Sequence, residues 1–400
     1  MIKRYNDKPM QNQENIYEVA IIGAGAAGQM GALRSVLNNK STIAFTGDAQ
    51  TKKKSRATWV HKVVNMPMAA DLNRPISSAS KDTFEWIKAE SGFADKFTDM
   101  QETVVTLEKD KKTGYFNLKT NTDKEFTAKY VVLATGIMDI QPEIDGSIRP
   151  VLPYANRGHV DYCVRCDGHK SKTKITATIG HGEAAAWVAI MLHERYQPPA
   201  MKIFTNGKTP EFPAETLPLL EAYNIKVVKE PIVGIKGDPK EKMEAFILKD
   251  CENLSEDCDK TKEEPVEFAF AMLGQIAYND LAKQVNADIN SRGNIICSSK
   301  GESSVSGLYV AGDLRDTGKY QIYTAWDQAV DSVDDIDGKI RKAFRDEFMK
   351  TVKPSAKPEQ KQEVPVKENL VKEEVKEEIV QEIKDVSVSA EEEIKEEAVS

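Results

Sequence analysis

Residues 17–28, YEVAIIGAGAAG, join a short apolar stretch to a glycine-rich turn. The three glycines have the G-x-G-x-x-G spacing found where a buried strand turns into a helix that binds a dinucleotide. The first glycine forms the turn, the second lets a pyrophosphate approach the backbone at the positive end of the helix, and the third lets the helix pack on the strand. We expect the helix to run to about Asn38 and a second strand to cover 41–47, so the chain opens with a βαβ unit.

Residues 173–194, TKITATIGHGEAAAWVAIMLHE, repeat this order of strand, glycine-rich turn and helix. The second turn has the G-x-G-x-x-A form, and a strand follows over 201–207. The distance from the first glycine of the turn to the glycine that ends the next strand is similar in the two copies, 24 residues and 27 residues. The repeat predicts an α/β fold with two Rossmann-like, three-layer nucleotide-binding domains.

Further elements are expected around these two units. A helix is predicted at 82–90 and another from about Ile322 to Phe344; strands are predicted at 102–108, 115–120, 128–136 and within 303–316.

The positions that usually distinguish one nucleotide from another are unusual in both units. The first unit has Thr46 and Gly47 where an acid normally binds the ribose, with Asp48 one residue late. The second has FTNGK (204–208), which offers neither that acid nor the arginines that bind the phosphate of NADP, and His181 stands inside its turn. The second unit is therefore either a working nicotinamide site or a retained fold with weakened binding.

The stretch DYCVRCDGHK (161–170) contains a C-x-x-C pair followed by an acid and a glycine. Three hypotheses fit the pair alone: a redox disulfide, half of a zinc site, or two uninvolved thiols. Zinc would require a second pair, and Cys251 and Cys258 have the wrong spacing for one. The redox hypothesis is favoured, since Arg165 and His169 would stabilise a thiolate and Asp167 is placed to transfer a proton.

Composition restricts the class of protein. The chain has 400 residues and a net charge of −8, of which residues 351–400 supply −6. The nearly neutral remainder argues against nucleic-acid or acidic-lipid partners, and no apolar run is long enough to predict a membrane span. The polar start has no secretory signal, and five cysteines in so long a chain indicate a reducing cytoplasm.

The order of the motifs resembles that of the low-molecular-weight thioredoxin reductases, a family of FAD-containing flavoproteins. G-x-G-x-x-G is followed by ATG (134–136), CVRCDG (163–168), G-x-G-x-x-A and AGD (311–313), and the likeness runs from about Tyr17 to Arg341. The resemblance implies a discontinuous FAD-binding domain with a nucleotide domain inserted into it. The expected boundaries are 1–16 for a polar extension, 17–140 and 285–345 for the FAD-binding domain, 141–284 for the NAD(P)H-type domain with the cysteines, and 346–400 for an acidic tail, disordered or partly helical.

The resemblance also implies the site. Electrons would pass from NADPH or NADH through FAD to a Cys163–Cys166 disulfide and on to a thioredoxin-like protein, with Cys166 facing the flavin, Cys163 exchanging with the substrate, and Asp167 as acid–base. The residues that correspond to the family's FAD site are Gly23, Gly25, Ala26, Gly28, Thr46, Gly47, Asn65, Ala134, Thr135, Gly136, Gly312, Asp313, Gln321, Ile322 and Ala325. Those of the nicotinamide site are Gly180, Gly182, Glu183 and Ala185. A homodimer without metal is expected.

Three stretches depart from the family pattern. TKKKS (51–55) replaces a Gly-Gly-Gln flavin loop, FTNGK replaces the arginine-rich stretch, and Trp326-Asp327-Gln328 replaces small residues. The donor thus stays open between NADPH, NADH, ferredoxin and another flavoprotein. An oxygen-reducing flavin oxidase and a non-catalytic redox-sensing flavoprotein, with a tail that recruits a partner, are competing hypotheses.

Overall fold

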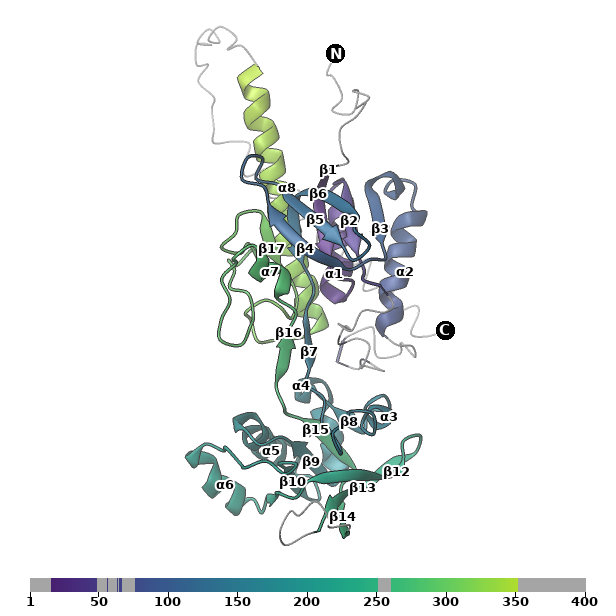
Figure 1. Cartoon of the computed structure of the whole chain (residues 1–400), viewed down its shortest axis with the longest axis vertical. Helices are drawn as coiled ribbons and strands as arrows, with labels where there is room; N and C mark the ends of the chain where they lie inside the picture. Colours follow the sequence, from purple (N-terminus) through teal and green to yellow (C-terminus); the bar gives the residue numbers. More distant parts are fainter. Residues whose placement is uncertain are drawn as a thin grey trace, which may run out of the picture. The chain divides into compact units, whose positions relative to one another are not determined.

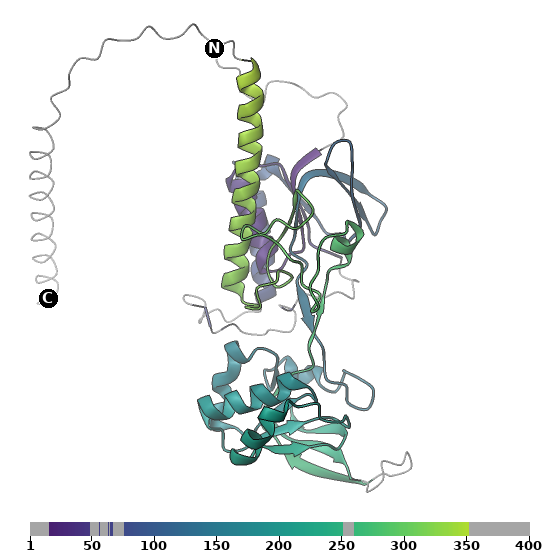
Figure 2. The ribbon, with the colours of Figure 1, turned by 90° about the vertical axis from the view of Figure 1, so that its left-hand side faces the viewer.

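The structure is a computed structural model, shown in Figures 1 and 2. It describes residues 16–48, 56, 63, 65–66, 76–250 and 260–351. The expectations for the N-terminal extension, the TKKKS loop, Cys251, Cys258 and nearly all of the acidic tail lie outside the described residues.

A seven-stranded sheet organises the first domain. Four parallel strands have the order β3–β2–β1–β6, β17 pairs with the end of β6, and the antiparallel strands β5 and β4 continue from the start of β6. The bounds are β1 (Ile16–Ile22), β2 (Thr42–Phe45), β3 (Phe97–Met100), β4 (Val104–Lys109), β5 (Phe116–Thr120), β6 (Glu125–Leu133) and β17 (Leu308–Val310).

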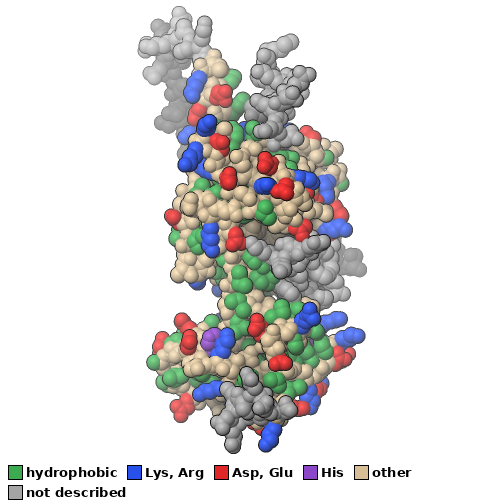
Figure 3. All heavy atoms as spheres, in the orientation of Figure 1, with side chains coloured by type: hydrophobic (Ala, Val, Ile, Leu, Met, Phe, Trp, Pro, Cys, Tyr) green, Lys and Arg blue, Asp and Glu red, His purple; other side chains and the backbone are tan. Residues whose placement is uncertain are grey.

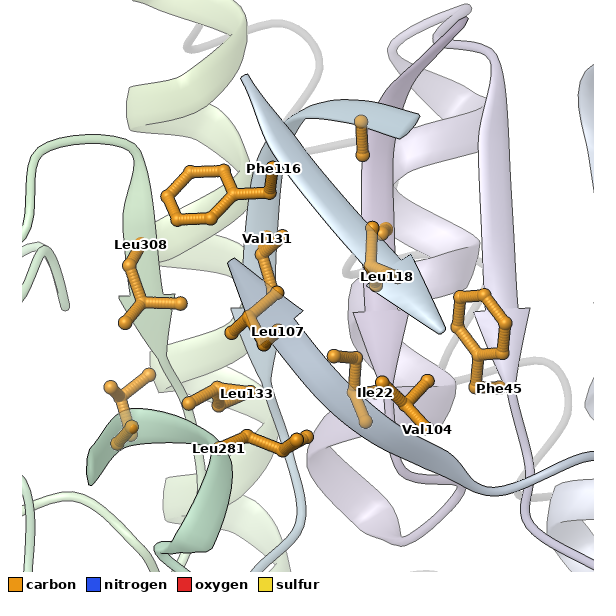
Figure 4. Packing of buried hydrophobic residues seen from close by; sticks show 14 of the residues in the cluster. Ile22, Phe45, Val104, Leu107, Phe116, Leu118, Val131, Leu133, Leu281 and Leu308 are labelled. Atoms are coloured by element: carbon orange, nitrogen blue, oxygen red, sulfur yellow. The ribbon is translucent and has the colours of Figure 1, made fainter. Parts of the chain in front are cut away.

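Both faces of the parallel part of this sheet are covered, one of them by the antiparallel strands of the same sheet. One face packs against helices α1 (Ala26–Leu37), α2 (Ile76–Ala89) and α8 (Ile322–Thr351). The other packs against β4, β5 and the short helix α7 (Asp280–Gln284). Figure 4 shows this second core, where Leu107, Phe116 and Leu118 lie over side chains of the parallel strands. The alternation of buried residues in β5 fits a strand with one buried face, whereas the register shift between Val104 and Thr106 interrupts this alternation in β4.

Helix α8 runs beside α1 (Figure 2). Arg34 of α1 pairs with Asp334 at 2.6 Å, and Lys40 pairs with Asp337 at 2.9 Å. The helix ends at Thr351 instead of the predicted Phe344. The sequence between these residues contains no glycine or proline to stop it, and the first proline is Pro354. By internal contacts the chain divides after Ala343, and the described part of the second unit is the end of α8.

The second domain has a five-stranded parallel sheet in the order β11–β10–β9–β15–β8. Its strands are β8 (Val160–Asp161), β9 (Thr176–Ile179), β10 (Met201–Phe204), β11 (Lys226–Val228) and β15 (Phe268–Ala271). Helices α5 (Glu183–Tyr196) and α6 (Leu217–Ala222) cover one face. The other face packs against an antiparallel sheet of β12 (Ile232–Asp238), β13 (Lys242–Lys249) and β14 (Thr261–Pro265).

Two strands connect the domains. The chain enters the second domain through β7 (Ile137–Asp139) and returns through β16 (Gln275–Ala277), and the two strands pair antiparallel. Shorter helices, α3 (Leu152–Ala155), α4 (Val164–Asp167) and the 3-10 helix η3 (Gly168–Thr173), precede β9. The predicted fold class, with one Rossmann-like domain inserted into another, is confirmed for the described residues.

Charged side chains of both signs are interspersed over the face shown in Figure 3. Among the helices of the described part, none combines the length and the apolar character needed to cross a bilayer.

Candidate functional site

A cavity of about 850 Å³ lies where the parallel strands of the first sheet end. The segments that follow β1, β2, β6 and β17 all contribute to its wall. Ligands of open α/β sheets bind at this carboxyl edge, and the volume is in the usual range of cofactor pockets, roughly 300–1,000 Å³.

Most residues expected to bind FAD line this cavity. Fourteen of the fifteen do so: Gly23, Gly25, Ala26, Thr46, Gly47, Asn65, Ala134, Thr135, Gly136, Gly312, Asp313, Gln321, Ile322 and Ala325. The remaining one, Gly28, lies buried in α1, where a Cβ would collide with the carbonyl of Gly23. Cys163, Cys166 and Asp167 line the same cavity.

Two glycines shape the cavity wall through their backbone. Gly23 has φ +113°, and a Cβ there would collide with the carbonyl of Ala134 on the neighbouring strand end. Gly312 has φ +82°, and a Cβ there would lie 2.9 Å from the Cβ of Ala27. Both conformations strain any residue with a side chain, so the wall requires glycine at these positions.

The N-terminus of α1 opens onto the cavity. Gly25 is its N-cap residue and lacks a side chain that could accept from the first N–H groups. These groups and the helix dipole provide a site for an anion such as a pyrophosphate.

Cys163 and Cys166 form a disulfide across α4, with Cα atoms 5.3 Å apart. Cys163 is the N-cap residue of α4, and its carbonyl accepts from the N–H of Cys166 at 3.0 Å. One helical turn thus brings the two thiols to bonding distance. Within the described ranges, no group of three or more His, Cys, Asp or Glu side chains is placed to hold a metal ion.

Gln321 connects the disulfide with Asn65, one of the expected flavin-site residues in the cavity wall. Its Nε2 lies 3.5 Å from Sγ of Cys163 and 3.7 Å from Sγ of Cys166. Its Oε1 accepts from Nδ2 of Asn65 at 2.7 Å. The side chain is almost fully buried, so these contacts fix the amide beside the sulfurs.

The acid after the disulfide belongs to a charged cluster. Nζ of Lys170 lies 2.8 Å from Oδ1 of Asp167 and 2.8 Å from Oδ2 of Asp161. Burial, followed by the charge of Asp167, raises the pKa of Asp161. Burial lowers the pKa of Lys170, but the two carboxylates outweigh it and the pKa is raised, which keeps the ammonium charged. Sequence reasoning found Asp167 but not its two partners.

Arg56 is a second residue that sequence reasoning missed. Its guanidinium donates to Asp139 at 2.7 and 3.3 Å and to Asp313 at 3.0 Å, and all three residues line the cavity. Burial raises the pKa of Asp313, and Arg56 opposes the rise. The only signal in the sequence was that Arg56 ends the basic run KKKSR.

The acidic residues near the end of β2 also differ from the usual nucleotide-binding pattern, in which an acid at this position binds the ribose. Asp48 accepts from Thr103 at 2.8 Å and from Asn121 at 3.1 Å, and it is not among the cavity residues. Glu102 does line the cavity, and its carbonyl accepts from the N–H of Gly47. Hydrogen bonds from Lys124 and two threonines lower the pKa of Glu102 to about 2, so it presents a carboxylate.

The second glycine turn lies apart from this cavity. Gly180, Gly182, Glu183 and Ala185 are absent from its lining. Gly182 is the N-cap residue of α5, which leaves a helix N-terminus comparable to that of α1. After β10, Asn206 donates to the carbonyl of Glu143 and accepts from the N–H of Ile232, both at 2.8 Å.

Comparisons with known proteins agree with this architecture. The family described as pyridine nucleotide-disulphide oxidoreductase matches residues 17–330. A thioredoxin reductase of Treponema pallidum (strain Nichols) is 27% identical over 321 residues, covering 78% of this chain and 93% of the relative. A ferredoxin–NADP reductase 2 of Sulfolobus acidocaldarius is 26% identical over 310 residues, covering 74% and 84%. The crystal structure of thioredoxin reductase from Streptococcus pyogenes MGAS5005 has a TM-score of 0.70 at 19% identity, covering 82% of this chain and all of that one, which supports the shared fold.

The chain belongs to the pyridine nucleotide-disulphide oxidoreductases. Within that family it is a divergent relative of the low-molecular-weight thioredoxin reductases, as the motif order predicted. It is an oxidoreductase, and the Cys163–Cys166 disulfide makes it one of the thiol–disulfide type.

Proposed function

We propose that the protein passes electrons from a reduced nicotinamide through FAD and the Cys163–Cys166 disulfide to a thioredoxin-like protein disulfide. The observation that carries the proposal is that one cavity contains both the flavin-type residues and the disulfide, with Gln321 in contact with both sulfurs. A redox-active pair needs a two-electron donor within reach, and this cavity offers the space for one.

The residues of the cavity fit FAD. The uncapped N-terminus of α1 suits the pyrophosphate, and the glycines that follow β1 and β17 leave room where a Cβ would intrude. Asp313 and the carboxylate of Glu102 offer acceptors for hydroxyl groups, and Asn65 and Gln321 offer amides. When bound, FAD would supply two-electron transfer between donor and disulfide.

The side chains around the disulfide have distinct roles in this proposal. Cys163 exchanges with the protein substrate, Cys166 faces the flavin, and Asp167 moves a proton to and from the thiols. The amide of Gln321 orients the pair, because its contacts with Asn65 and both sulfurs fix its position.

A reduced nicotinamide is proposed as the donor because α5 presents an uncapped N-terminus after a G-x-G-x-x-A turn, to which Gly180, Gly182, Glu183 and Ala185 belong. The side chain of Asn206, two residues after β10, is occupied by contacts within the protein, and FTNGK contains no arginine for a 2′-phosphate. The same stretch also lacks the acid that binds the ribose of NADH, but an unpaired 2′-phosphate costs more than one missing ribose hydrogen bond, which favours NADH over NADPH. The missing side chains also keep ferredoxin or another flavoprotein as the second candidate donor.

The acceptor, assembly and compartment are proposals of the same kind. Relatives named thioredoxin reductase, at 27% and 26% identity, support a thioredoxin-like acceptor. A homodimer is proposed from the resemblance, and a reducing cytoplasm from the sparse cysteines.

An anaerobic titration tests the donor. The purified protein should be yellow, and its flavin band should bleach with NADH at lower concentration than with NADPH. Bleaching by dithionite alone would contradict the nicotinamide proposal and leave the thiol–disulfide proposal standing. A purified protein that neither carries nor takes up flavin would contradict both.

A cysteine substitution tests the route. Cys166→Ser should abolish reduction of a protein disulfide while the donor still bleaches the flavin. Cys297→Ser is the matched control, because Cys297 is the free, half-buried cysteine of the described residues and should leave both activities unchanged. Wild-type disulfide reduction by Cys166→Ser would refute the assignment, and rapid peroxide formation by it in air would favour the oxidase.

A further inference from the structure

Lys170 bridges two carboxylates next to the disulfide. Asp161 ends β8, Asp167 ends α4, and Lys170 lies in η3, so three elements bring one ammonium between two acids. Both carboxylates are mostly buried, with side-chain exposures of 16%, and the lysine is at 31%. All three residues line the cavity beside Cys163 and Cys166.

An aromatic ring of the sheet also restricts the position of the Lys170 ammonium. The ammonium lies 5.7 Å from the centre of the Phe268 ring on β15, the strand that pairs with β8. A buried aromatic face and two anions at 2.8 Å leave the ammonium little freedom. The arrangement is therefore a mostly buried part of the cavity wall and not an exposed surface ion pair.

We propose that Lys170, anchored by Asp161, is a positioning residue that holds the Asp167 carboxylate in place beside the disulfide for proton transfer with the thiols. The inference rests on the proposed thiol–disulfide function and adds two residues to it.

The proton step has a defined balance. In the dithiol form, Asp167 accepts the proton of one thiol, and the resulting thiolate attacks the substrate disulfide. The substrate S–S bond breaks, the enzyme S–S bond forms, and two electrons pass to the substrate sulfurs. The proton on Asp167 and the proton of the second thiol complete the two substrate thiols. Lys170 stabilises the carboxylate that begins and ends this cycle.

Charge decides the direction of each expected effect. The cluster of two carboxylates and one ammonium carries a net charge of −1. Removing the ammonium leaves two mostly buried anions together and raises the pH at which the neighbouring thiols lose their protons. Removing Asp161 leaves a neutral pair and lowers that pH.

Other charged groups surround the cluster. Lys174 interacts with Asp161, and His159 interacts with Lys170 and Lys174. Tyr162 follows Asp161 in sequence, and Arg165 and His169 flank Asp167 on α4 and η3. They are the same in every variant compared, so differences between variants report on the cluster.

The test is the pH profile of alkylation of reduced Cys163 by iodoacetamide, which requires no flavin. Trypsin cleaves after Arg165 and separates the two cysteines, so mass spectrometry follows Cys163 alone. Lys170→Met should move the midpoint upward by roughly one to two pH units, and Asp161→Asn should move it downward. Lys170→Arg should retain the wild-type midpoint, as should Lys172→Met on the exposed side of η3.

Opposite shifts distinguish this inference from a merely structural role, which would not reverse sign. Shifts in the same direction, or no shift, would overturn it even if the wild-type dithiol reduces a protein disulfide. A wild-type dithiol that reduces no protein disulfide would instead overturn the proposed function. Should Lys170→Met not fold, the downward shift of Asp161→Asn decides alone, and its absence refutes the inference.

Discussion

Arg56 should be a major source of stability in the cavity wall. It is the shared cation of Asp139 and Asp313, whose side chains are only 10% and 20% exposed, and is itself 18% exposed. Arg56→Met leaves the mostly buried carboxylates of Asp139 and Asp313 without this cation. Loss of one partner of a buried pair costs about 3–5 kcal/mol, and the remaining exposure reduces this to about 2–4 kcal/mol.

The loss should depend on pH in a defined direction. Burial raises the pKa of Asp313 and Arg56 opposes the rise, so the pKa in the variant is higher still. A carboxyl whose folded pKa exceeds its unfolded value, about 3.9, favours the folded state once it is protonated. The destabilisation is therefore greatest at neutral pH and diminishes as pH falls through the raised pKa.

Thermal melting of the purified protein between pH 8 and pH 5 measures this effect. The melting temperature should fall by roughly 5–15 °C at pH 8 and by less at pH 5. Arg56→Met combined with Asp313→Asn should recover part of the loss. Lys236→Gln removes an exposed pair with Glu263 and should change nothing measurable. A pH-independent decrease, or one no larger than that of the control, would refute the reasoning.

Two further predictions concern Gly312 in the cavity wall and the ion pair between Asp337 of α8 and Lys40, which follows α1. Gly312→Val should weaken flavin binding at least tenfold in equilibrium titration, because φ is +82° and the added atoms meet Ala27; retention of wild-type affinity would contradict the fit of FAD to this cavity. Burial raises the pKa of Asp337, but hydrogen bonds from Lys40 and Arg341 outweigh burial, and the pKa is lowered. The contribution of Asp337 to stability is therefore complete above its unfolded pKa of about 4 and is lost as pH falls toward the lower folded pKa. Asp337→Asn should therefore lower the melting temperature at pH 7 and have less effect near pH 3; an equal effect at both pH values would count against the ion pair with Lys40.

The sequence predicted the repeated nucleotide-binding fold well because its determinants are local. A buried strand that runs into a glycine turn is encoded within a dozen residues, as Gly23 and its positive φ illustrate. The close spacing of Cys163 and Cys166 likewise places both thiols on one helical turn. The end of α8 was predicted seven residues early, since no local signal stops the helix between Phe344 and Thr351.

The chain by itself thus determined the two glycine turns and the C-x-x-C pair, and its motif order identified fourteen flavin-site residues that do line the cavity. Only the tertiary structure decided which charges meet. Arg56 lies 83 residues from Asp139 and 257 from Asp313, and the packing of three distant segments around one cavity brings these groups together. Lys170 and Asp161 are close in sequence, yet their shared contact with Asp167 depends on how β8, α4 and η3 converge. Ion pairs of this kind follow from packing in three dimensions, which no spacing along the chain encodes.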